Sequence, residues 1–105
     1  MDKPTLVIGA SLKDNRYSNT CVRTLKAAHF AVTAIGQREG MIGTVQVLTG
    51  LPELSNIHTV TLYLSSTNQK QWYDYILKLN PKRVVFNPGA ENNEFASMLS
   101  SAGIE

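Results

Sequence analysis

The sequence contains a single cysteine, Cys21, among its 105 residues. One thiol cannot form a disulfide within the chain, so the cytoplasm is the expected compartment. No apolar run approaches the roughly 20 residues that cross a membrane. The first four residues also lack the apolar stretch of a signal peptide. We therefore expect a cytoplasmic protein that does not associate with membranes.

Charge is scarce as well. Charged residues make up 17% of the chain, and the formal net charge is only +2. This balance is too small to indicate a nucleic-acid partner, although it suits a small anionic ligand. A hydrophobic content of 43% is typical of a globular protein. At this length we expect one domain over residues 1–105, which is small for an enzyme that binds two substrates.

Several motifs of nucleotide and metal chemistry are missing. The chain has neither a G-x-G-x-x-G fingerprint nor a P-loop. No spacing of His and Cys indicates a metal site, and we expect none. Structural roles are favoured for both histidines, His29 and His58, because one ends a predicted helix and the other precedes a strand. We therefore expect no catalytic residue.

What the sequence does have is an alternation of strands and helices. The predicted strands are residues 5–8, 30–35, 45–48, 59–64 and 83–86. One predicted helix begins near Ser18, capped by Ser18 or Asn19, and a second follows caps at residues 65–67. The last predicted helix ends at Gly103. This order predicts an α/β fold: a doubly wound parallel sheet of about five strands, with right-handed crossovers that place helices on both faces.

The predicted helices have clear apolar faces. The first carries Cys21 on its core face, so a small buried hydrophobe is the favoured interpretation of this thiol. In the second, Trp72 and Tyr75 share a core face with Ile76 and Leu79, which favours packing over a stacking platform.

The first strand and helix enclose a turn of small residues. Gly9, Ala10 and Ser11 follow the buried strand at residues 5–8. Small side chains let a ligand approach the backbone, and free N–H groups at a helix start favour an anion. This stretch predicts a phosphate site.

Ligands of such sheets bind beyond the carboxyl ends of the strands. That rule selects the loops at residues 9–18, 36–43, 63–68 and 87–92. Glu91 is the only carboxylate in the last of these loops and would be the place to look for a general base. Glu91 and Glu94 are also predicted on one helical face, where two acidic residues are more often a favourable charge in the first turn of a helix.

The residues after the second strand bear on the identity of the nucleotide. Gly36, Gln37 and Arg38 follow Ile35, where a dinucleotide site would have an acidic residue. An arginine there suits a ribose that carries a phosphate, as in NADP or coenzyme A (CoA), and a solvated surface charge is the alternative.

A family resemblance distinguishes these two ligands. Residues 5–11 (TLVIGAS), 16–18 (RYS), 60–63 (VTLY) and 81–92 (PKRVVFNPGAEN) resemble the small stand-alone CoA-binding proteins of bacteria. Those proteins are similar to the CoA-binding domain of the succinyl-CoA synthetase α subunit, which implies a Rossmann-like fold. The relatives continue past residues 103–105 into another strand, so the expectation is either an uncovered sheet edge or a chain that is naturally short or truncated. The relatives also have a proline and a basic residue where this chain has Gly36 and Gln37.

The resemblance implies a site for CoA or an acyl-CoA, with the ADP portion over the first turn. Phosphate contacts are expected near Ser11 and Arg16, and the 3′-phosphate beside Gln37 and Arg38. The positions expected to contact the cofactor are Gly9, Ala10, Ser11, Lys13, Arg16, Tyr17, Ser18, Gln37, Arg38, Tyr63, Leu64, Ser65, Asn87, Pro88, Gly89 and Glu91.

The function predicted from the sequence is therefore CoA binding without catalysis. One alternative is an NADP-linked or other nucleotide-dependent enzyme. Another is an interaction module of a larger synthetase-like assembly, with the uncovered edge or the last helix as the docking surface. Homodimerisation through that edge is a further alternative.

Overall fold

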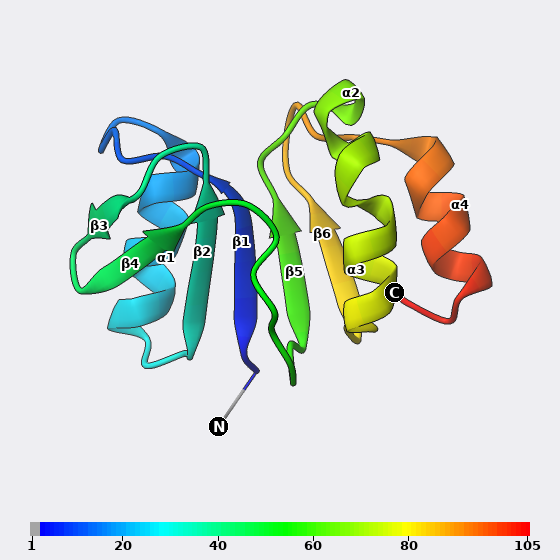
Figure 1. The fold of residues 1–105 in the computed structure, drawn as a ribbon, viewed down its shortest axis with the longest axis horizontal. Coiled ribbons are helices and arrows are strands. Elements are labelled where there is room, and N and C mark those ends of the chain that lie inside the picture. Colours follow the sequence, from blue (N-terminus) through cyan, green and yellow to red (C-terminus); the bar gives the residue numbers. More distant parts are fainter. Residues whose placement is uncertain (1–2) are drawn as a thin grey trace.

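The computed structural model describes residues 3–105, which form one six-stranded sheet. The strands in spatial order are β3, β4, β2, β1, β5 and β6 (Figure 1). Neighbouring strands run parallel, except that β3 is antiparallel to β4. The strand bounds are β1 Thr5–Ala10, β2 Val32–Gly36, β3 Gly40–Ile42, β4 Val45–Leu48, β5 Thr59–Leu62 and β6 Arg83–Phe86.

The sixth strand corrects the expected count of about five. β3 lies within residues 36–43, which were predicted to be a loop, and it pairs with β4 across a tight turn that contains Gly43 at φ +60°. Ile42 is buried, whereas its neighbour Met41 is exposed. Three residues that include a glycine are too few to show the alternation by which a strand is recognised.

Helices cover both faces of the sheet, as predicted. The α1 helix (Tyr17–Ala27) lies on one face, and α3 (Tyr73–Leu79) and α4 (Asn93–Ser101) lie on the other (Figure 1). Val22 of α1 packs into a core with Val7 and Val47. Ile76 of α3 and Phe95 of α4 pack into a second core on the opposite face. The sheet is therefore buried between two apolar layers over much of its width.

This placement follows from the handedness of the crossovers. From β1 the chain moves to β2 on one side, whereas from β5 it moves to β6 on the other side. Right-handed connections in opposite directions put their helices on opposite faces. The strand order thus reverses between β1 and β5, and the loops that follow these strands meet at one edge of the sheet. We call it the carboxyl edge.

The second predicted helix is divided into three pieces. These are α2 (Ser66–Gln69), a 3-10 turn η1 (Lys70–Trp72) and α3. The predicted aromatic packing is confirmed, because the rings of Trp72 and Tyr75 meet edge to face with centroids 5.5 Å apart against the core. Asn80, in the left-handed conformation at φ +51°, ends α3 before Pro81.

The expected helix caps are partly wrong. The N-cap of α1 is Arg16, whose side chain makes no capping hydrogen bond, and Ser18 and Asn19 are buried within the helix. Ser65 occupies the N-cap position of α2 without a side-chain bond. At the other end of the chain, Gly103 has φ +78° just beyond α4, as predicted for a left-handed helix end.

Candidate functional site

The first turn (residues 9–13) leaves β1 through a bulge at Gly9. The pairing of β1 with β2 shifts register between Ile8 and Ala10, and Gly9 has φ +91°. A Cβ atom at Gly9 would lie 2.8 Å from the Tyr63 carbonyl oxygen and 3.1 Å from a methyl carbon of Leu64. Glycine therefore lets the first turn lie directly against the loop after β5.

On its other side the first turn contacts the segment that joins β2 to β3. A Cβ atom at Gly36 would clash with the Ala10 carbonyl oxygen, and one at Gly40 would lie 2.7 Å from Leu12. Gln37 and Arg38 lie between these two glycines and are exposed. The fold thus brings the first turn beside the two residues expected near the 3′-phosphate.

Two buried polar residues of α1 hold the first turn. The Ser11 N–H donates to Ser18 Oγ at 3.1 Å, and Asn19 Nδ2 donates to the Ser11 carbonyl oxygen at 2.9 Å. Arg23 Nε in turn donates to Asn19 Oδ1 at 2.7 Å. Asn19 was considered only as a helix cap, because a sequence does not show that a side chain reaches back eight residues.

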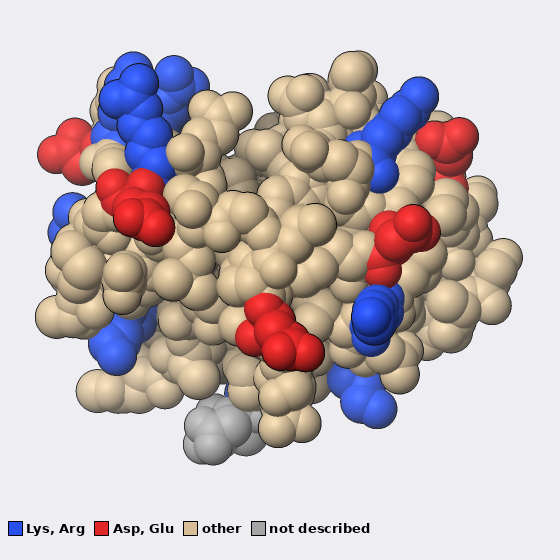
Figure 2. Space-filling view, viewed as in Figure 1, with Lys and Arg blue, Asp and Glu red and all other residues tan. Residues whose placement is uncertain are grey.

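Basic side chains are available around the first turn. Lys13, Arg16 and Arg38 are all exposed and belong to the loops after β1 and β2. Figure 2 shows lysine and arginine side chains gathered at this corner of the molecule, beside a notch in its outline. Tyr17, at the start of α1, is 86% exposed and is free to contact a ligand.

The loop after β6 is tied to the end of β5. Asn87 Nδ2 donates to Thr61 Oγ1 at 2.6 Å and to the Leu62 carbonyl oxygen at 2.9 Å. Glu91 Oε1 accepts from the Gly89 N–H at 3.0 Å. Glu91 precedes α4, so the expectation that Glu91 and Glu94 share a helical face is wrong, since helical geometry begins only after the Asn92 cap.

Gln69 joins the loops after β5 and β6 to each other. Its side chain is completely buried, and Nε2 donates to the carbonyl oxygens of Leu64 at 2.8 Å and Ala90 at 2.7 Å. Its Oε1 accepts from Asn92 Nδ2 at 3.0 Å. Sequence analysis missed this residue, because a glutamine in a polar helical segment resembles any solvated side chain.

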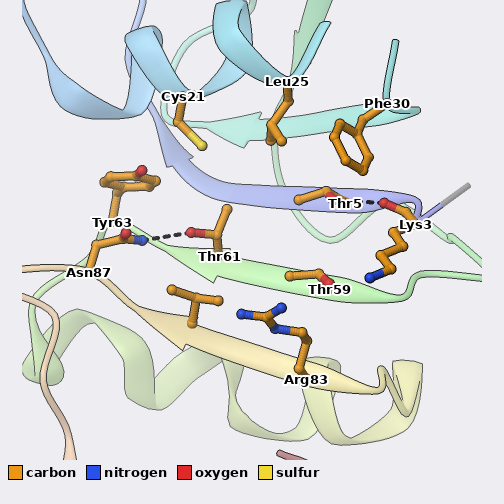
Figure 3. A pocket seen from close by; sticks show the side chains of 11 residues that line it. Lys3, Thr5, Cys21, Leu25, Phe30, Thr59, Thr61, Tyr63, Arg83 and Asn87 are labelled. Carbon is orange, nitrogen blue, oxygen red and sulfur yellow. Dashed lines mark hydrogen bonds between the residues drawn. The ribbon is translucent and has the colours of Figure 1, made fainter. Parts of the chain in front are cut away.

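A groove of about 340 Å³ opens on the sheet face beside α1 (Figure 3). Its floor is the part of β5 and β6 that no crossover helix covers on this face, and Tyr63 and Asn87 line the groove near the carboxyl edge. Cys21, half-buried, points into it from α1 (Figure 3). Burial, followed by the neighbouring Cys21 side chain, raises the pKa of Tyr63 to about 12, so its hydroxyl is protonated at neutral pH.

Of the sixteen predicted contact residues, Gly9 and Ala10 end β1, Tyr17 and Ser18 begin α1, and the other twelve lie in loops at the carboxyl edge. The first turn contacts Tyr63 and Leu64 directly. Ser65, Pro88 and Gly89 belong to the loops after β5 and β6 and are exposed. The histidines lie elsewhere: His58 Nδ1 is 2.7 Å from Thr59 Oγ1 at the start of β5, and His29 is exposed beyond α1. Within residues 3–105, no three His, Cys, Asp or Glu side chains are grouped to hold a metal ion.

No helix in the described part of the chain is both long and apolar enough to cross a membrane.

An α/β sheet with its loops gathered at a reversal of strand order defines the class of Rossmann-like proteins. Within this class, a family model described as a CoA binding domain matches residues 3–105. The chain therefore belongs to the CoA-binding domain family. A comparison with curated proteins gave no match.

Solved structures support the same fold. A crystal structure described as that of an uncharacterized protein is 39% identical, with a TM-score of 0.95 over 100% of this chain and 87% of the other. A hypothetical protein from Pyrococcus horikoshii OT3 is 20% identical, with a TM-score of 0.86 over 97% of this chain and 72% of the other. A Thermus thermophilus protein is 23% identical, with a TM-score of 0.86 over 97% and 78% of the two chains. The last two likenesses show the fold alone.

Proposed function

We propose that this protein binds CoA or an acyl-CoA through the ADP portion and has no catalytic activity of its own. The observation that carries the proposal is the position of the first turn, between the loop after β5 and the segment that begins β3. Membership of the CoA-binding domain family supports the choice of ligand.

In this proposal the first turn receives the diphosphate. The backbone at Gly9, Ala10 and Ser11 can approach phosphate oxygens closely because its side chains are small. The start of α1 adds N–H groups and a favourable dipole, and the exposed Arg16 adds a positive charge. Lys13 and Tyr17 complete this half of the proposed site, and the buried Ser18 supports it by accepting a hydrogen bond from the Ser11 N–H.

The 3′-phosphate of CoA is assigned to Gln37 and Arg38. Arg38 is exposed two residues beyond the end of β2, where its guanidinium can pair with a phosphate in a bidentate arrangement. Tyr63, Leu64 and Ser65 would lie along the adenine or the pantetheine arm, and residues 87–89 and 91 would line the far side.

The absence of catalysis is proposed from the state of the one candidate base. The Glu91 carboxylate accepts a hydrogen bond from the Gly89 backbone and is exposed. A general base needs a partner that tunes its pKa and a proton within reach. Binding of a loop backbone is the simpler role for this carboxylate.

A thermal-shift panel with CoA, acetyl-CoA, dephospho-CoA, NADP, NAD and ATP at equal concentrations tests the ligand. A ligand that binds only the folded state raises stability according to its concentration relative to Kd. We expect a shift with CoA and acetyl-CoA that decreases with dephospho-CoA. A shift with NADP alone would favour the enzyme alternative, and no shift with any ligand would contradict the proposal.

The variant Arg38→Glu tests the 3′-phosphate contact. It should weaken CoA more than dephospho-CoA, because only CoA carries the phosphate that the new carboxylate repels. Lys82→Glu makes the same change of charge just before β6, far from the carboxyl edge, and should leave both affinities nearly unchanged. Equal losses for the two ligands in Arg38→Glu would contradict the assigned role.

A further inference from the structure

Gln69 is the buried polar residue at the end of α2, and all of its side-chain hydrogen-bonding atoms are engaged. Both of its donated bonds go to backbone carbonyl oxygens, one in each of two loops. Its single acceptor receives a bond from Asn92, which also caps α4 through Phe95 N–H at 3.0 Å. One side chain thus joins α2, the loop after β5, the loop after β6 and the start of α4.

These bonds fix distances that the strands alone do not fix. The parallel pairing of β5 and β6 ends at Leu62 and Phe86, before either loop begins. Beyond that point, Asn87 bonds back to the end of β5. Among residues 3–105, only Gln69 bonds the Leu64 and Ala90 carbonyl oxygens to a common atom. A buried amide is tolerated only while it is hydrogen-bonded, so neither loop can move away without leaving a polar group unpaired.

The loop after β5 also forms one wall of the first turn. The Leu64 side chain lies 3.1 Å from the position that a Cβ atom of Gly9 would occupy. Ala90, the other residue held by Gln69, directly precedes Glu91. The bonds of Gln69 therefore set the spacing between the first turn and the far side of the proposed CoA site.

We propose that Gln69 is a positioning residue for CoA binding, which holds the loops after β5 and β6 at the separation that the ligand requires. This inference rests on the proposed function and extends it to a buried residue that does not touch the ligand. It distinguishes two halves of the site. The phosphate half at residues 9–18 and 37–38 does not depend on Gln69, whereas the half at residues 63–65 and 87–91 does.

The variant Gln69→Met tests this role, because methionine has a similar volume and cannot donate to the two carbonyl oxygens. We expect the affinities for CoA and dephospho-CoA, measured by calorimetry, to fall by the same factor of about ten, as for loops that must be ordered on binding. The ratio of the affinities for CoA and dephospho-CoA should therefore stay constant in Gln69→Met, whereas it should fall in Arg38→Glu. Val84→Ala, at the opposite end of β6, is the control for a general loss of stability and should keep the wild-type affinity. Unchanged affinity in Gln69→Met, or a loss confined to CoA, would overturn the proposal.

A second measurement needs no ligand. In amide hydrogen exchange, Gln69→Met should increase exchange in residues 64–68 and 89–91 about tenfold while α1 keeps its protection. Unchanged exchange in those loops would refute the positioning role of Gln69 even if the wild-type protein binds CoA. If the wild-type protein binds no ligand of the panel, the proposed function fails and with it the role in CoA binding, whatever the exchange shows. Gln69→Glu, which keeps an acceptor for Asn92 and, with its carboxyl protonated, can donate to only one of the two carbonyl oxygens, replaces Gln69→Met if that variant does not fold.

Discussion

Two glycines with the same backbone angle allow steric contact to be separated from backbone strain. Gly9 and Gly89 both have φ +91°, but only a Cβ at Gly9 would meet other atoms within 4 Å. Alanine in a left-handed conformation costs about 1–2 kcal/mol. We expect Gly89→Ala to lower the free energy of unfolding by that amount, and Gly9→Ala to lower it by about 3 kcal/mol or more.

Urea unfolding of the two glycine variants measures this difference. Similar losses in both would mean that the Tyr63 backbone moves aside easily. In that case the first turn would not be held against the loop after β5.

Tyr63 gives a prediction about pH. Its pKa of about 12 in the folded protein is above the value of about 10 for an unfolded tyrosine. The protonated form is thus favoured by folding, so the contribution of Tyr63 to stability is complete below about pH 10 and is lost between about pH 10 and pH 12.

Unfolding free energies of the wild type and Tyr63→Phe, followed from neutral to alkaline pH, test this prediction. The wild type should lose more stability than the variant at alkaline pH, because phenylalanine does not titrate. Parallel curves for the two proteins would show that Tyr63 titrates normally.

At this scale, the glycine turn and the exposed arginines could be predicted from the sequence because their chemistry is local. Ser11, Gln37 and Arg38 were predicted from their residue types and from their positions in the loops that follow predicted strands. Asn19 and Gln69 differ, because their partners lie 8 and up to 23 residues away. Only the folded chain reveals such bonds.

At the scale of the helices and strands, Asn92 supports the α4 helix in two separate ways. Asn92 Oδ1 caps the helix, whereas Nδ2 donates to Gln69 Oε1 and to the Tyr73 hydroxyl at 2.8 Å. Asn92→Ala should lower the free energy of unfolding by about 1–3 kcal/mol, because it removes the cap and leaves a buried acceptor unpaired. Asn92→Ser keeps a capping oxygen and should recover about 1 kcal/mol of this loss.

Chemical denaturation of the two Asn92 variants separates the contribution of the cap from that of the contacts to Gln69 and Tyr73. If serine recovers nothing, the contacts to Gln69 and Tyr73 account for the whole effect. That result would contradict a stabilising role for the cap.

The elements also show where sequence patterns are informative. The predicted bounds of β4 and β6 match the structure, since apolar or β-branched residues occupy three of the four positions in each. The division of residues 66–79 into α2, η1 and α3 was not predicted, because the apolar spacing of Trp72, Tyr75 and Ile76 continues through it. The break coincides with the burial of Gln69, which is followed by the exposed Lys70 and Gln71 of η1.

For the whole molecule, CoA should act as a stabilising ligand whose effect depends on its concentration. At a hundred times Kd, stabilisation should reach about 2.7 kcal/mol. For a domain of this size the midpoint of thermal unfolding should then rise by about 10 °C or more. Differential scanning calorimetry over a series of CoA concentrations measures this rise, and a midpoint independent of concentration would exclude specific binding.

The central position of β1 has a consequence for synthesis on the ribosome. One side of β1 pairs with β2, only a helix away in sequence, but its other side pairs with β5 at residues 59–62. A growing chain can assemble β1, α1 and β2 early, yet it leaves one long edge of its most apolar strand unpaired until more than half of the residues have emerged. For that interval the nascent protein is a sheet with an exposed central edge, and this edge of β1 stays open to aggregation until β5 arrives.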